Sequence, residues 1–192
     1  MTDSAVLHAW VDESMQTTGG GFYVLAASVA DPAQCDPIRD ELRGLLLGKA
    51  KRLHWRDEVP RRRKVIASVI TSLDTPHTVV VGTPISPQRQ ERARRLCLER
   101  LLYELTALGV SQVWLESRTQ SLNARDLTMV AALRSRGGIP KSLVIDFAQP
   151  EQEPMLWLPD AIAGAVAGHY RGEAIAFNIL RTAVTLHTIT LS

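Results

Sequence analysis

The sequence predicts an α/β fold in which a mixed five-stranded sheet is flanked by helices. Short runs of apolar, β-branched residues alternate with longer segments whose apolar residues recur every three or four positions, the periods of strands and amphipathic helices. The first two runs are separated only by the glycine-rich segment 15–21, which is typical of a hairpin. Each later run follows a helical segment, as right-handed crossovers between parallel strands require. We therefore expect a three-strand antiparallel meander followed by parallel strands.

The predicted elements can be placed in chain order. Strands are expected at the short apolar runs 6–11, 22–30, 77–82, 112–115 and 143–145, with a further strand in the second half of 182–190. Helices are expected where the apolar stripe has helical spacing, at 35–47, 60–73, 86–108, 124–136 and 158–170. Pro60 and Pro159 suit first helical turns, and Gly109 suits a helix end. All elements fit one domain over 1–192, with a two-helix insertion at about 33–74 and a C-terminal extension at about 172–192.

Composition excludes several classes of protein. A formal net charge of +2 is too small to predict a nucleic-acid partner by itself. No segment is apolar over the length of a membrane span, and the N-terminus has no basic, apolar leader. Cys35 and Cys97 form no close-spaced motif of the kind used by zinc sites or redox pairs. We expect a cytoplasmic protein without a membrane partner.

Carboxylates follow two of the predicted strands. Asp12 comes directly after the first buried run, Glu116 ends the fourth strand, and Asp160 lies near the start of the last helix. If the fourth strand joins the first in parallel, these three acids meet at one edge of the sheet, to which the long helix also brings Glu91. Carboxylates that converge there are the ligands preferred by Mg²⁺ or Mn²⁺. The sequence therefore predicts a divalent-cation site of the kind used in phosphoryl transfer.

Each of these acids also has a simpler interpretation. Asp12 or Glu13 could cap the following turn, and Asp160 could favour a helix N-terminus. Glu116 could pair with Arg118 or with another nearby basic side chain. Glu13 should point to the opposite face from Asp12, because side chains alternate along a strand. The same kind of alternative, a solvated ion pair or a turn, applies to two further acids: Glu91 and Asp146.

Basic residues gather between the two inserted helices. The group comprises Lys49, Lys51, Arg52, Arg56, Arg61, Arg62, Arg63 and Lys64. Such a cluster favours phosphate binding, although a solvated basic surface is an equal alternative. Within it, His54 could lie near a scissile phosphate and Trp55 could stack on a base, or the two could form a packed structural pair. We expect Lys51, Arg52, Arg56 and Trp55 to contact substrate.

Four segments carry a resemblance to a known family. They are residues 10–14 (Trp-Val-Asp-Glu-Ser), 53–55 (Leu-His-Trp), 115–116 (Leu-Glu) and 158–164 (Leu-Pro-Asp-Ala-Ile-Ala-Gly). They resemble the family known as domain of unknown function 3800, whose members are similar to the ribonuclease H-like superfamily, and the resemblance spans most of the chain. It implies a ribonuclease H-like fold, with Asp12, Glu116 and Asp160 as ligands of Mg²⁺ or Mn²⁺ and His54 as a further catalytic position.

The chain departs from the family pattern at three positions. Met15 stands where the family usually has Gly, Trp157 where it has Gln, and Pro159 where it has Ala. The leading hypothesis is a divalent-metal-dependent nuclease or phosphoryl-transfer enzyme acting on nucleic acid. The departures at Trp157 and Pro159 favour an alternative, a catalytically degenerate ribonuclease H-like module that binds nucleic acid or a protein. A third hypothesis is a homodimer built through the C-terminal strand.

Overall fold

A six-stranded mixed sheet forms the centre of the computed structural model, which describes residues 6–191. The strand order is β5-β4-β1-β2-β3-β6. The strands are β1 (Leu7–Gln16), β2 (Phe22–Ala30), β3 (His77–Thr83), β4 (Val110–Glu116), β5 (Val144–Ala148) and β6 (Val184–Thr190). The predicted mixed sheet with its antiparallel meander is confirmed, and β6 extends it by one strand beside β3.

Strand direction brings two functional ends together. β2 runs antiparallel to both of its neighbours, β1 and β3, whereas β4 pairs in parallel with β1 and with β5. The C-terminal ends of β1 and β4 therefore meet at one edge of the sheet. In open α/β sheets this edge is where ligands generally bind.

The first strand is longer than predicted. We expected it to end at Val11, but β1 continues to Gln16 because its pairing with β2 persists to the pair Gln16↔Phe22. Its pairing with β4 stops earlier, at Val11↔Leu115. Asp12 thus lies inside a strand, one residue beyond the last β1–β4 pair, and does not emerge into a turn.

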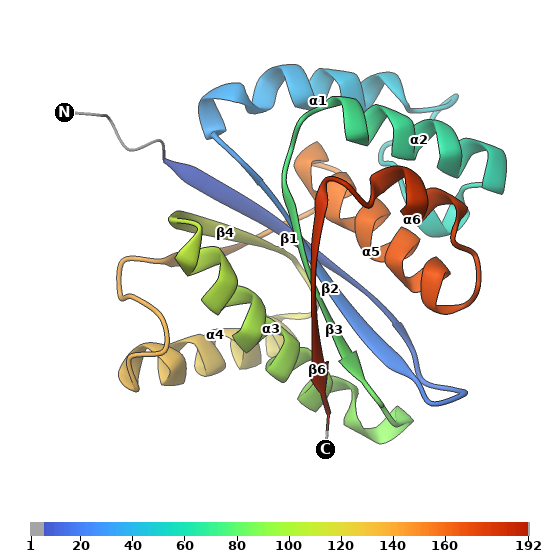
Figure 1. Cartoon of the computed structure of the whole chain (residues 1–192). Coiled ribbons are helices and arrows are strands. Elements are labelled where there is room, and N and C mark those ends of the chain that lie inside the picture. The colour runs from blue at the N-terminus through green and yellow to red at the C-terminus, as the bar shows by residue number, and fades with distance from the viewer. Residues whose placement is uncertain (1–5, 192) are drawn as a thin grey trace.

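Helices cover both faces of the sheet (Figure 1). One face carries α1 (Cys35–Gly44), α2 (Pro60–Ser72), α5 (Trp157–Tyr170) and α6 (Ile175–Leu180), and the other carries α3 (Gln90–Ala107) and α4 (Gln120–Ser135). The short helix α6 was not predicted, and α1 ends before the expected boundary at 47. No helix among residues 6–191 combines the length and the apolar character needed to cross a membrane.

Each face of the sheet has its own hydrophobic core. Trp10 and Trp114 pack toward α5, whereas Val11 and Leu115 pack toward α3 and α4. Because side chains alternate, the residues two positions after the tryptophans, Asp12 and Glu116, also face α5. The buried pattern of two adjacent strands therefore places two carboxylates on the same face of the sheet.

Candidate functional site

Three carboxylates interact where β1 and β4 separate. Asp12 comes from β1, Glu116 is the last residue of β4, and Asp160 lies in the first turn of α5. Desolvation raises the pKa of Asp12 well above its ordinary value, and the charges of Asp160 and Glu116 and a hydrogen bond to Glu116 raise it further. The guanidinium of Arg94 opposes this shift. The structure thus brings together the three acids predicted from the sequence.

Asp160 also holds the loop that carries the predicted His54. Its Oδ2 accepts a hydrogen bond from the backbone N–H of Trp55 at 2.7 Å and lies 3.4 Å from His54 Nδ1. The interaction with Asp160 raises the pKa of His54. The Asp160 side chain keeps 15% of its surface exposed. Asp160 therefore anchors the 54–55 segment while it faces the other carboxylates.

These carboxylates form an incomplete cation site. Among residues 6–191, no group of three or more His, Cys, Asp or Glu side chains has the spacing of a metal site. The donor chemistry still suits an oxygen-preferring cation, because Asp12 is desolvated beside two further carboxylates that repel its charge. One carboxylate oxygen of Asp160 is less available to a cation, since it accepts the hydrogen bond from the backbone N–H of Trp55.

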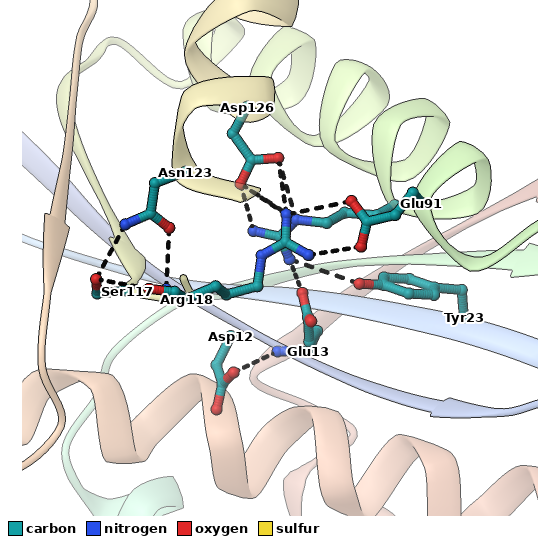
Figure 2. A network of polar contacts seen from close by, with 9 residues as sticks. Asp12, Glu13, Tyr23, Glu91, Ser117, Arg118, Asn123 and Asp126 are labelled. Carbon is teal, nitrogen blue, oxygen red and sulfur yellow. Dashed lines mark hydrogen bonds and ion pairs between the residues drawn. The ribbon is translucent and has the colours of Figure 1, made fainter. Parts of the chain in front are cut away.

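The opposite face of β1 carries a buried ion-pair network (Figure 2). Glu13 points away from Asp12, as strand alternation predicts, and pairs with Arg94. Arg94 is 3% exposed and also donates to Asp126, at 2.9 Å from Nη2. The hydroxyl of Tyr23 lies 3.5 Å from the same guanidinium. This network fixes β1 against α3 and α4 directly behind Asp12.

Arg118 extends the network toward the site. Its guanidinium pairs with Glu91 at 2.7 Å and with Asp126 at 3.2 Å, and its backbone N–H donates to Asn123 Oδ1 at 2.9 Å. The simpler interpretation of Glu116 as the ion-pair partner of Arg118 is therefore wrong, whereas Glu91 does form the ion pair expected of it. Sequence reasoning missed Arg94 and Asp126, and the only local signal was a charged residue on the inward face of each helix.

Two of the three carboxylates, Asp12 and Glu116, share a small cavity with the network, and Asp160 is not part of its lining. Its volume is about 230 Å³. It is lined by Val11, Asp12, Glu13, Arg94, Glu116 and Arg118. Acidic and basic groups thus meet in one polar hollow at the point where β4 leaves β1.

The basic segment is only partly available to a ligand. Lys51 and Arg56 are exposed, whereas Arg52 lies 3.5 Å from Glu151. Trp55 is 4% exposed and packs against Gly164, so its ring is not open to a base. The packed structural interpretation of Trp55 matches this environment.

Several solved structures share this fold. No family model and no curated protein matches the chain. Ribonuclease HII of Archaeoglobus fulgidus, solved in a complex with PCNA, is 17% identical over 91% of this chain and 79% of its own, with a TM-score of 0.54. Ribonuclease H2 of Pyrococcus horikoshii OT3 is 14% identical over 94% and 81%, with a TM-score of 0.53. The fold is ribonuclease H-like. Bst-RNase HIII, solved in complex with Mn²⁺, is 19% identical over 93% of this chain and 60% of its own, with a TM-score of 0.53.

At these identities the ribonuclease H-like resemblance establishes the fold alone. The resemblance to the domain of unknown function 3800 family stays a prediction, since no family model matches. The departures at Trp157 and Pro159 lie at the start of α5, where both side chains are buried. Trp157 donates its indole N–H to the carbonyl of Pro150 at 2.7 Å, so it has a structural role in positioning this helix.

Proposed function

We propose that this protein is a divalent-metal-dependent nuclease or phosphoryl-transfer enzyme that acts on nucleic acid. The observation that carries the proposal is the convergence of Asp12, Glu116 and Asp160 at the edge of the ribonuclease H-like sheet. There the charges of Asp160 and Glu116 raise the pKa of the desolvated Asp12. Like charges held in a desolvated site require protons or a cation. A structural neighbour, Bst-RNase HIII, is solved in complex with Mn²⁺, which is consistent with a cation at this site.

Each residue has a defined role in this proposal. Asp12 and Glu116 would hold Mg²⁺ or Mn²⁺, and Asp160 would complete the oxygen ligands. Such a cation, when bound, activates water and stabilises a leaving oxygen. His54, which is partly exposed beside Asp160, would lie near the scissile phosphate.

The basic segment would contact the substrate backbone. Lys51 and Arg56 are exposed, with no carboxylate within 4.0 Å among residues 6–191. Arg52, which lies 3.5 Å from Glu151, would release this carboxylate to bind a phosphate. These contacts would be independent of base sequence, because they reach only phosphates.

A second candidate function is a degenerate ribonuclease H-like module that binds nucleic acid or a protein. It is favoured by the hydrogen bond from Trp55 to Asp160, which occupies one potential ligand oxygen. It is also favoured by the lack of a three-ligand group within residues 6–191. This alternative retains the fold and the basic surface but predicts no response to metal.

Thermal melting separates the two functions. The protein and its Asp12→Asn variant would be melted with Mn²⁺, with Mg²⁺ and with EDTA, because a cation bound only by the folded state raises the midpoint. Asp146→Asn is the matched control: Asp146 also lies in a strand and accepts a hydrogen bond from the next backbone N–H, at 2.8 Å compared with 2.7 Å for Asp12. The enzyme proposal requires stabilisation by Mn²⁺ in the wild type and the control but not in Asp12→Asn, together with metal-dependent cleavage of labelled DNA or RNA. If millimolar metal does not change the melting midpoint of the wild type, the binding module remains as the function.

We also propose that two copies associate through β6. Within residues 6–191 this strand lies at the sheet edge and pairs with β3 alone, and it contains no Lys or Pro of the kind that blocks edge pairing. Light scattering over a range of concentrations tests this, with Leu186→Lys as the variant, since Leu186 is exposed in β6. A monomer at every concentration would disprove association.

A further inference from the structure

Helices α3 and α4 lie on the face of the sheet opposite α5 (Figure 1), and side chains of both line a groove. Its volume is about 900 Å³. Apolar side chains form part of its lining: Leu96, Met129 and Leu133. Arginines stand along both walls, with Arg92 and Arg95 on α3 and Arg125 on α4.

The three wall arginines are exposed and uncompensated. None of Arg92, Arg95 and Arg125 has a carboxylate within 4.0 Å in the part of the chain that the structure describes. The acidic residues of the groove are already neutralised by other arginines. Glu91 and Asp126 pair with Arg118, and Glu99 pairs with Arg136. The groove therefore offers free guanidinium groups to an anion, and planar guanidinium forks match phosphate oxygens.

One end of the groove adjoins the candidate active site. Glu91 and Asp126 line the groove, and both pair with Arg118. Arg118 also lines the 230 Å³ cavity that contains Asp12 and Glu116. The guanidinium of Arg118 thus contacts two residues of the groove, Glu91 and Asp126, and also borders the cavity that Asp12 and Glu116 line.

We propose that the α3–α4 groove binds a single-stranded nucleic acid, with its phosphates on Arg92, Arg95 and Arg125. The proposal rests on the proposed function, and it specifies single-stranded nucleic acid as what this enzyme would bind. The two basic walls would follow the phosphate backbone of a single strand, and Leu96, Met129 and Leu133 between them would contact the bases and sugars that a single strand exposes. The spacing of Arg92 and Arg95, three residues apart on a helix, puts both on one wall.

The groove differs from the basic segment predicted from the sequence. Residues 49–64 lie beside the α5 face, and several of their arginines are paired within the protein: Arg52 with Glu151, Arg62 with Glu58 and Arg63 with Glu173. Each wall of the α3–α4 groove has an arginine without a carboxylate partner among the described residues. We therefore assign the main contacts with the single strand to the groove.

The test compares two double variants that lose the same charge. Arg95→Gln/Arg125→Gln removes one arginine from each groove wall, and Lys141→Gln/Arg181→Gln removes two exposed cations elsewhere. Binding of a labelled single-stranded oligonucleotide, as DNA and as RNA, is measured by fluorescence anisotropy in EDTA over a range of salt concentrations. EDTA separates binding from metal-dependent cleavage, which is assayed on its own.

The groove variant should bind roughly tenfold more weakly, and its slope of log K against log salt should fall by about 1.4, or about 0.7 for each lost phosphate contact. The control variant should bind like the wild type, and both should melt like it, because the altered side chains are exposed. An equal loss in both variants, or no binding by the wild type, would overturn the proposal. Equal competition by polyglutamate would identify an acidic peptide as the occupant instead. Groove-dependent binding without cleavage would support the groove and refute the nuclease.

Discussion

Gly164 is the position where a single methyl group should disturb both the core and the candidate site. It lies in α5 one turn after Asp160, and its backbone touches the ring of Trp55. A Cβ atom at Gly164 would lie 2.0 Å from Trp55 Cδ1, 2.6 Å from Cγ and 2.7 Å from Nε1. Carbon atoms pack at about 3.5–4.0 Å, so the Gly164→Ala variant must displace the indole ring.

The magnitude follows from what holds the ring. Trp55 is 4% exposed, and its backbone N–H donates to Asp160 at 2.7 Å, so a small slide of the ring is resisted from both sides. Ejection of the ring approaches the cost of truncating a buried Trp, about 3–5 kcal/mol. Alanine recovers about 1 kcal/mol over glycine in a helix. The net loss of unfolding free energy should be about 2–4 kcal/mol.

Urea denaturation measures this loss. The matched control is Gly44→Ala at the end of α1, where a Cβ meets nothing within 4 Å, and this variant should be unchanged or slightly stabilised. A double-mutant cycle with Trp55→Leu should be strongly non-additive, because the smaller side chain makes room for the methyl group. A Gly164→Ala loss below about 1 kcal/mol, or costs that simply add, would refute the argument that the Gly164–Trp55 contact positions this loop.

Two further predictions concern buried charge. Burial lowers the pKa of His77 to about 4, compared with about 6.5 in an unfolded chain. Protons therefore favour the unfolded state, and stability should fall by up to roughly 3 kcal/mol as the pH drops from about 6.5 to about 4. Chemical denaturation across this range should show a flatter profile for His77→Asn. Asp126, 5% exposed between Arg94 and Arg118, should cost about 1.5–3 kcal/mol when changed to Asn, because the buried Arg94 and the partly buried Arg118 each lose one carboxylate and keep only Glu13 and Glu91. Asp40→Asn, which breaks an exposed pair, should cost under about 1 kcal/mol in the same measurement, and equal losses would contradict this account.

Much of the candidate site is local in the sequence. Asp12 and Glu116 each follow a buried run and come two residues after a tryptophan of the same face, so alternation alone puts them together once β1 and β4 are parallel. Asp160 is predictable from the sequence because it lies in the first turn of an apolar helix. The role of these acids as metal ligands stays a prediction.

The ion-pair partners of the arginines and the packing of Trp55 could not be predicted from neighbouring residues. Arg118 has acids at Glu116, Glu91 and Asp126 to choose from, and it pairs with the latter two because α3 and α4 pack beside it. Trp55 looked like a stacking platform in a basic segment, but Gly164 lets it pack into the core. Both outcomes depend on residues distant in the sequence.

The sequence by itself determined the order of the strands and of the helices other than α6, and the acids that follow the buried runs of β1 and β4, because periodicity and alternation are properties of neighbouring residues. Only the tertiary structure decided that β1 continues to Gln16, that Asp160 holds the Trp55 loop and that three arginines between α3 and α4 have no carboxylate partner among residues 6–191. Strand ends, ion-pair partners and grooves arise where separate segments meet. Their free energies are set by the distances and burial that packing creates.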